Sequence, residues 1–475
     1  MKFIFFILSK EEAKMGEAKK RGSYEERKKL AQQTKLEYLT SEMIDFSDSN
    51  IIFLKKGYEF LRKNIHPNEW EQRRSAIIEY LKDRPKDYTS KNSRIRFKED
   101  EIAWYIFLCE EFFRHPFCTN PSQMSRIAPW VISLGKSVDI LEQLDNIQSK
   151  IKDLIRKYKN NPDGTFFELL VAASYLRKGF KVELLEATGG KTPDLRVYNE
   201  DTEFFVECKK LQRRTDYAEK EREIYLIGWD KVKNKLIADF PNYWFEIEIK
   251  TELVGNKSFD LSSKFNKLQS MQNEIKFYED NEIKIKGQKR SVECINQYLE
   301  NNYVKLESFL FLKLLGGDTV QSNSDRTHIS QISPEYFQAA SAPILGTTVG
   351  KVNKFSGATR KFSNENSQNK KAKAVGKQVK EALDQLETFE NKVVHVLYEA
   401  MESEDIELLR WKKIEECIDE LSGKLTTGDS IKIHRIQYVE HIDQMFDVLE
   451  SIRVWGRELP CEDFVLIPNL IKNPL

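Results

Sequence analysis

The sequence lacks the cysteine and histidine patterns of structural metal sites. Its six cysteines are widely spaced with no C-x-x-C pair, and its six histidines form no H-x-H or H-x-x-x-H pattern. Closely spaced cysteines and histidines are typical of zinc sites, and dense cysteines are typical of disulfide-rich secreted domains. We therefore expect no structural zinc, no disulfide framework and a reducing, cytoplasmic environment.

Long apolar runs are also missing. The run from Phe3 to Leu8 is far shorter than the roughly 20 residues that a membrane-spanning helix needs. Charged residues follow it where a signal peptide would have a small-residue cleavage site. A charged helical segment begins at Met15, which is a candidate start of translation. The sequence predicts a protein without a membrane anchor.

Neither sign of charge is in excess, because 76 Lys and Arg residues stand against 75 Asp and Glu residues. The net field is therefore too weak to attract nucleic acid, and any such affinity must come from local basic patches and a metal site. The chain is long enough to bury more than one hydrophobic core, because it has 475 residues and 40% of them are hydrophobic.

Periodicity and breaks in the pattern divide the chain into five segments. We expect a charged arm over 1–35 and, from apolar residues at helical spacing, an all-helical domain over 36–159. Mixed helix and strand patterns predict an α/β domain over 160–255. Residues 256–374 predict an insertion with an apolar strand from Ser308 to Leu315 and a mobile basic loop over 341–374. Residues 375–475 predict a further α/β segment.

Ionisable side chains stand in the core-like stretch from Asn161 to Leu211. The helix expected from about Phe166 to Lys178 is apolar on nearly every face, so Glu168 must either find a partner or titrate. Two interpretations are open. Thr165 and Glu168 fit the S/T-x-x-E capping box, in which Glu168 bonds back to the start of the helix; alternatively, Glu168 belongs to a functional site.

A hairpin is predicted next, and its register brings two carboxylates together. If residues 199–202 form the turn, Asp194 lies directly opposite Glu207, and Lys209 shares their face. Opposed carboxylates repel each other. Taken singly, Asp194 has an ordinary alternative as the first residue of a strand, and Glu207 with Lys209 as an exposed alternating face.

A divalent cation between the two carboxylates would remove the repulsion. Mg²⁺ takes carboxylate and backbone oxygens and keeps several waters, so the carbonyl of Cys208 is a further candidate ligand. Lys209 would then hold or help to deprotonate a water that attacks a phosphate. Glu168 would bind a second metal ion or orient a metal-bound water.

This set resembles a known motif. Pro193-Asp194, then Glu207-Cys208-Lys209, preceded by a helical Glu168, resembles the PD-(D/E)xK motif of restriction-endonuclease-like phosphodiesterases. The resemblance implies an α/β fold with an αβββαβ core. It implies Asp194, Glu207 and Glu168 as ligands of Mg²⁺ or Mn²⁺, with Lys209 as the catalytic lysine. It also implies an endonuclease that cuts nucleic acid, DNA rather than RNA, with a defence role and a homodimer for cutting two strands.

Such a core needs one more helix and strand after the hairpin, and two candidates are open. The nearer is Tyr217 to Phe240 with Tyr243 to Lys250, which we favour because it is adjacent. The farther is Lys373 to Leu386 with Lys392 to Leu397, which would place the C-terminal segment in the nuclease sheet.

Basic residues near these elements are expected to contact phosphates. They are Lys210, Arg213 and Arg214 just after the hairpin, and Lys373 and Lys377 on the farther helix. Two other function classes stay open: a restriction-like module that binds nucleic acid or protein without cutting, and a structural protein that acts through its helical and C-terminal segments.

Overall fold

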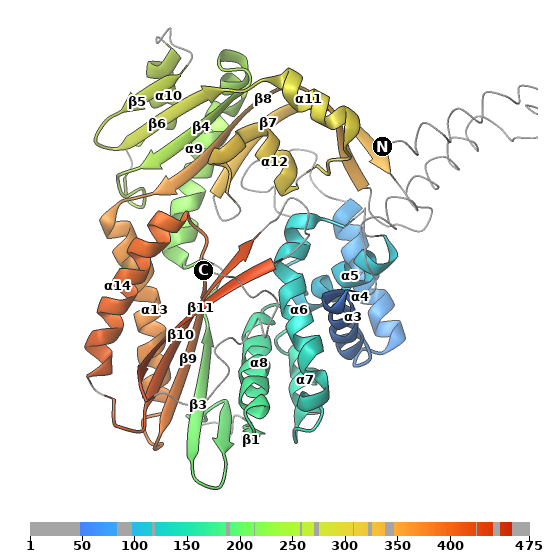
Figure 1. The fold of residues 1–475 in the computed structure, drawn as a ribbon, viewed down its shortest axis with the longest axis vertical. Helices are drawn as coiled ribbons and strands as arrows, with labels where there is room; N and C mark the ends of the chain where they lie inside the picture. The colour runs from blue at the N-terminus through green and yellow to red at the C-terminus, as the bar shows by residue number, and fades with distance from the viewer. Residues whose placement is uncertain are drawn as a thin grey trace, which may run out of the picture.

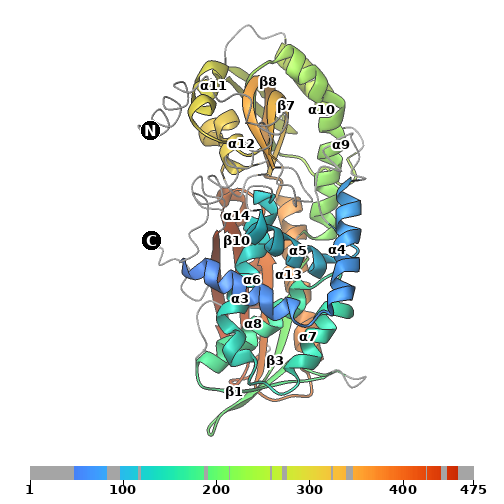
Figure 2. The same ribbon diagram turned by 90° about the vertical axis from the view of Figure 1, so that its right-hand side faces the viewer.

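The computed structural model describes residues 48–82, 97–115, 119–186, 191–212, 214–256, 259–269, 275–306, 308–321, 325–337, 346–423, 425–439 and 447–457. The charged arm expected over 1–35 lies outside these ranges. The described chain has a mixed α/β fold with two mixed β-sheets, which lie at opposite ends of the long axis (Figures 1 and 2). None of the helices within these ranges is long and apolar enough to cross a membrane.

Helices fill the N-terminal region, as the periodicity predicts. They are α3 (Ser49–Arg62), α4 (Pro67–Lys82), α5 (Glu101–Arg114), α6 (Pro121–Leu141), α7 (Ile147–Arg156) and α8 (Asp163–Arg177). Side chains of Asp48, Asp100 and Asn120 accept hydrogen bonds from backbone N–H groups in the first turns of α3, α5 and α6, which explains where these helices begin.

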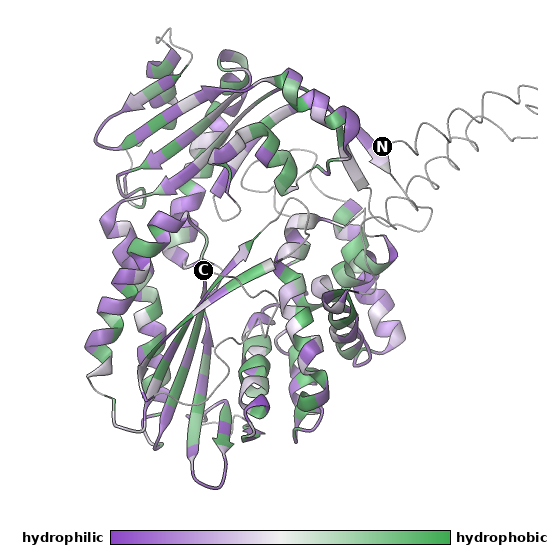
Figure 3. Ribbon diagram, viewed as in Figure 1, coloured by the Kyte–Doolittle hydropathy of each residue, from purple (hydrophilic) through white to green (hydrophobic). Residues whose placement is uncertain are grey.

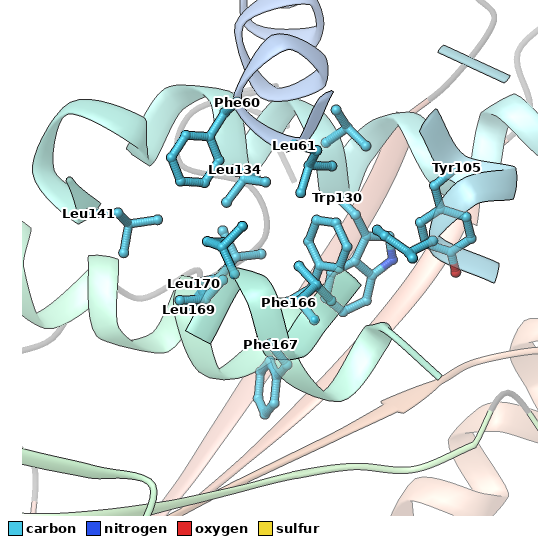
Figure 4. Packing of buried hydrophobic residues seen from close by; sticks show 14 of the residues in the cluster. Phe60, Leu61, Tyr105, Trp130, Leu134, Leu141, Phe166, Phe167, Leu169 and Leu170 are labelled. Carbon is cyan, nitrogen blue, oxygen red and sulfur yellow. The ribbon is translucent and has the colours of Figure 1, made fainter. Parts of the chain in front are cut away.

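The helical region shares its core with the sheet that follows. One hydrophobic cluster runs from Leu54 in α3 through α5, α6 and α8 to sheet residues such as Val206 and Leu397. Figure 4 shows Phe166, Leu169 and Leu170 packed against residues of neighbouring helices. Hydrophobic residues accordingly concentrate on α8 and on the central strands, whereas α14 carries many hydrophilic ones (Figure 3). The helices therefore form one layer of an α/β unit with a shared core.

The first sheet has six strands in the order β1-β2-β3-β9-β10-β11. They are β1 (Lys181–Leu184), β2 (Leu195–Tyr198), β3 (Glu203–Lys210), β9 (Lys392–Glu399), β10 (Ser430–Val439) and β11 (Asp447–Gly456). β3 and β9 are parallel, as are β9 and β10, and the other neighbours are antiparallel. α8 packs on β1 and β3, while α13 (Glu365–Gln385) packs on β3, β9 and α14 (Glu404–Ser422).

The second sheet lies between β3 and α13 in the sequence. Its five strands run in the order β5-β6-β4-β8-β7. This segment comprises α9 (Asp216–Asp239), β4 (Tyr243–Ile249), α10 (Leu261–Gln269), β5 (Lys276–Glu279), β6 (Ile283–Lys289), α11 (Val292–Asn301), α12 (Phe309–Gly316), the 3-10 helix η3 (Gly317–Thr319), β7 (Asp325–Phe337) and β8 (Gly346–Phe362).

Three expectations are wrong in this region. The strand preferred for completing the first sheet, Tyr243 to Lys250, is β4 of the second sheet, and the farther candidate supplies β9. The nearer candidate was the wrong choice because the whole second sheet is inserted after β3. The strand expected from Ser308 to Leu315 is helix α12, which Ser308 caps by accepting a hydrogen bond from the N–H of Phe311. A short run that is apolar throughout has no periodicity that separates helix from strand.

The basic loop expected over 341–374 is largely strand β8 and the start of α13. Small residues in β8 make room for a large neighbour: a Cβ added to Gly357 would lie 2.3 Å from the indole ring of Trp244. Gly357 therefore serves close packing, although the glycine- and serine-rich composition indicated a loop.

Candidate active site

The β2–β3 hairpin has the predicted register. Tyr198 pairs with Glu203 and Leu195 with Val206, where the paired ladder ends. Asp194 directly precedes β2, and Glu207 is the next residue of β3. The N–H of Asp194 donates to the carbonyl of Val206 over 3.0 Å, which holds Asp194 beside the last paired residues of the hairpin. The predicted pairing of the two strands is confirmed over residues 195–198 and 203–206.

Asp194 is held in place by the opposite strand. Its Oδ2 accepts a hydrogen bond from the N–H of Cys208 over 2.8 Å. Burial, and then the charge of Glu207, raise the pKa of Asp194 to about 7. The repulsion that the register predicted is therefore present, and the carboxylate is fixed where a cation would relieve it.

Glu207 is buried to 2% side-chain exposure and bonds to Lys209. Oε1 of Glu207 lies 2.5 Å from Nζ of Lys209, whereas Oε2 is buried and lacks a hydrogen-bond partner within the described residues. Burial raises the pKa of Glu207, although Lys209 opposes this effect. One oxygen of Glu207 thus remains available to a ligand.

Lys209 is positioned by a second partner, on α13. Its Nζ lies 3.0 Å from Oε1 of Gln385, whose Nε2 donates to the carbonyl of Thr192 over 2.9 Å. Burial would lower the pKa of Lys209, but the hydrogen bond and charge of Glu207 raise it. Gln385 therefore ties the helix to β3 and to the segment that leads into β2. No pattern in the sequence indicated this role of Gln385.

Glu168 is not a capping residue. α8 begins at Asp163 with Pro162 in the N-cap position, so Thr165 lies inside the helix and the capping-box interpretation is wrong. Glu168 instead forms an ion pair with Lys150 of α7. Burial, followed by the charge of Asp194, raises the pKa of Glu168 to about 7. Glu168 therefore belongs to the same electrostatic cluster as Asp194.

Lys150 is the residue that sequence reasoning missed. α7 is strongly amphipathic, with Ile147, Ile151 and Leu154 buried. Lys150 lies next to these buried residues on the surface of α7, and only 20% of its side chain is exposed. Although burial would lower its pKa, the charge of Glu168 raises it. A lysine on the buried side of an amphipathic helix was the available signal, because such a lysine needs an acidic partner.

The residues meet part of what a divalent cation requires. Across the described ranges, no group of three or more His, Cys, Asp or Glu side chains is arranged to hold a metal ion. Asp194 and Glu207 nevertheless supply hard oxygen donors, and the unpartnered buried Oε2 of Glu207 suits such a cation. Three carboxyl groups stand here against two ammonium groups, so a cation would balance their remaining charge.

Two of the expected phosphate contacts are buried in ion pairs. Nζ of Lys210 is 2.9 Å from Glu399 and 3.7 Å from Asp163, with 2% of its side chain exposed. Arg214 is bound to Asp325 over 2.8 Å. The prediction that Lys210 contacts phosphate is therefore wrong, because alternation along β3 turns this side chain into the core.

The remaining predicted residues have mixed outcomes. Lys373 and Lys377 are exposed on α13, as phosphate contacts must be, and Arg213 lies outside the described residues. The thiol of Cys208 is buried, and burial raises its pKa. Metal binding by the carbonyl of Cys208 stays a prediction.

Comparisons of the chain with protein-family models, curated proteins and solved structures gave no match. The case for a function therefore rests on the geometry of this site.

Proposed function

We propose that this protein is a metal-dependent nuclease that hydrolyses phosphodiester bonds, with DNA as the preferred substrate. One observation carries the proposal: the hairpin holds the Asp194 carboxylate, bonded to the N–H of Cys208, beside Glu207, and Lys209 is bonded to Glu207. Opposed buried carboxylates are electrostatically unfavourable without a cation, and perturbed carboxyl groups of this kind cluster at functional sites.

The order of elements supports the proposal. α8, the antiparallel strands β1, β2 and β3, then α13 and the parallel strand β9 follow the αβββαβ order of restriction-endonuclease-like enzymes. In this assignment α9 to β8 form an insertion between β3 and α13. Glu168 lies on the first helix and the other three residues on the hairpin, where the PD-(D/E)xK resemblance requires them.

Each residue has a role under this proposal. Asp194 and Glu207 would hold Mg²⁺ or Mn²⁺, which as a Lewis acid stabilises charge on the scissile phosphate. Lys209 would turn its Nζ from Glu207 towards the attacking water and offset the charge that develops on phosphate oxygens. Glu168 would orient that water or hold a second ion, while Lys150 keeps its carboxylate in position.

The test is cleavage of single-stranded and double-stranded DNA and RNA in Mg²⁺ or Mn²⁺. Asp194→Asn and Lys209→Met should each reduce the cleavage rate by about 10²-fold or more. Glu200→Gln changes an exposed carboxylate in the turn of the same hairpin and is the matched control. Cleavage that survives both site substitutions would refute the assignment.

A second candidate function is a restriction-like module that binds nucleic acid or protein without cutting. The favouring observation is that Lys209 and Lys150 already neutralise Glu207 and Glu168, and that the described residues contain no three-ligand cluster. Calorimetric titration with Mn²⁺ separates the two functions. Binding that disappears in Asp194→Asn supports the nuclease, and its absence from the unmodified protein supports the binding module.

A further inference from the structure

Lys150 and Glu168 form an ion pair on the side of the candidate active site that the helices supply. Nζ of Lys150, on α7, is bonded to Oε2 of Glu168, on α8. The two side chains are only 20% and 16% exposed. Charged side chains are rarely this buried unless they are paired. The pair is therefore an internal part of the site and differs from a contact between mobile surface side chains.

This ion pair belongs electrostatically to the same cluster as the hairpin carboxylates. The negative charge of Asp194 repels Glu168 and attracts Lys150. Glu168 in turn repels Glu207. Glu168 is thus the third carboxylate of the cluster, and Lys150 is the counter-charge that the helices contribute to it.

The two sides of the site differ in what they leave for a metal ion. On the hairpin, Oε1 of Glu207 is bonded to Lys209, but Oε2 is buried and lacks a hydrogen-bond partner within the described residues. On the helices, Oε2 of Glu168 already lies against the Lys150 ammonium group. A divalent cation bound by Glu168 would share the carboxylate with this ammonium group or displace it. In both cases two positive charges would lie side by side, which is unfavourable in a mostly buried site.

The formal charges of the cluster also favour one metal ion over two. Its three carboxylates and two ammonium groups leave one net negative charge. One divalent cation would turn this into one net positive charge, which the single negative charge of a phosphodiester balances. A second divalent cation would leave three net positive charges before the substrate binds. Uncompensated charge of this kind is costly where water is largely excluded.

We propose that the candidate active site binds a single divalent cation, held by Asp194 and Glu207, and that the Lys150 ammonium group supplies at Glu168 the positive charge of a second ion. This inference rests on the proposed nuclease function. It assigns Glu168 to the orientation of water and makes Lys150 a positioning residue. An ammonium group donates hydrogen bonds but has no open coordination position. Lys150 would therefore balance charge without acting as a Lewis acid.

The experiment counts the Mn²⁺ ions bound by the full chain, using isothermal titration at pH 8 without nucleic acid. The unmodified protein should bind one ion per chain, and Asp194→Asn should lose it. Lys150→Gln should bind two ions, because the Glu168 carboxylate is then free of its counter-charge. Lys152→Gln removes an exposed positive charge from the same helix and should still bind one ion.

Two further variants separate the loss of the counter-charge from a loss of folding. Lys150→Arg keeps a cation beside Glu168 and should bind one ion. The double variant Lys150→Gln with Glu168→Gln keeps the net charge of the cluster, and no buried charge is left without a partner. It should bind one ion with an affinity within tenfold of that of the unmodified protein. Circular dichroism shows which variants are folded.

The outcomes separate this inference from the proposed function. Two ions bound by the unmodified protein would overturn the inference and leave the nuclease proposal standing. The same holds if folded Lys150→Gln binds only one ion, or if the double variant loses its ion, since Glu168 would then be a ligand. If the unmodified protein binds no Mn²⁺, the inference and the proposed function fail together.

Discussion

The N–H of Cys208 donates a hydrogen bond of 2.8 Å to Oδ2 of Asp194, across the hairpin that carries the candidate active site. This bond holds the Asp194 carboxylate beside Glu207 although their charges repel. The pKa of Asp194 rises to about 7, first through burial and then through Glu207. The hairpin thus keeps an unfavourable pair of charges in a fixed geometry, and removing one charge should stabilise the protein.

Asp194→Asn should raise the free energy of unfolding in EDTA at pH 8 by about 1–2 kcal/mol. A carboxyl group with a raised folded-state pKa binds its proton more tightly when folded, so its effect on stability becomes unfavourable as pH rises from about 4 to 7. The two proteins should therefore differ less at pH 5. Urea unfolding at both pH values measures this, with Glu200→Gln as the control. Destabilisation of Asp194→Asn at pH 8 would contradict the expectation.

Lys150→Gln should destabilise the protein at pH 8 by about 1–3 kcal/mol, because it leaves the Glu168 carboxylate buried without its counter-charge. The double variant Lys150→Gln with Glu168→Gln should recover most of this loss. A double-mutant cycle by urea unfolding measures the coupling. Lys152→Gln, an exposed position on the same helix, should have little effect. Additive single effects would show that the two side chains do not interact.

Substitution of Lys210 should lower the stability of the protein, whereas substitution of Lys373 should affect DNA binding alone. Lys210→Met leaves Glu399 and Asp163 short of a buried partner and should cost about 3–5 kcal/mol of stability. Lys373→Gln should change stability by less than about 0.5 kcal/mol because this side chain is exposed. If Lys373 contacts a phosphate, its replacement should reduce the number of ions released on DNA binding by about one. This number is obtained from the slope of binding affinity against salt concentration. Thermal unfolding and salt-dependent binding assays separate the two effects.

A buried chain of hydrogen bonds should make stability sensitive to acid. His395 bonds to the hydroxyl of Tyr175 over 2.8 Å and to His434 over 2.9 Å, and His434 bonds to Glu450 over 2.8 Å. Burial, then His434, hold the pKa of His395 well below its usual value. The unfolded chain therefore takes up a proton below about pH 6.5 that the folded protein does not, and stability falls as pH falls.

Replacing this histidine should reduce that effect. His395→Gln should show a shallower loss of stability than the unmodified protein between about pH 6.5 and 5, whatever its stability at pH 8. Urea unfolding across this range measures the slope. Equal slopes would show that His395 does not hold its neutral form in the folded protein.

The hairpin was predictable because its determinants are local. Polar turn residues and alternating side chains fix the pairing of Tyr198 with Glu203, and from that pair the position of Asp194 follows by counting. The helix of Glu168 was predictable for the same reason. Its partner Lys150 was not, because the contact depends on how α7 packs beside α8.

The larger organisation could not be read from the sequence. The strand beside β3 is β9, and no local pattern tells that a strand pairs across an inserted sheet. Lys210 was misassigned because its neighbours Lys209 and Arg214 made it look like part of a basic surface. Its burial depends on acidic residues from α8 and β9, which are distant in sequence.

The insertion between β3 and β9 also has a consequence for synthesis of the protein. β3 ends at Lys210 and β9 begins at Lys392, so a chain growing from its N-terminus exposes one edge of β3 while the entire second sheet is made. At about 5–20 residues per second, this interval lasts on the order of ten seconds or more. An open strand edge is a site of unwanted intermolecular pairing. Among the strands of the described residues, β3, which carries Glu207 and Lys209, therefore waits longest for a neighbouring strand.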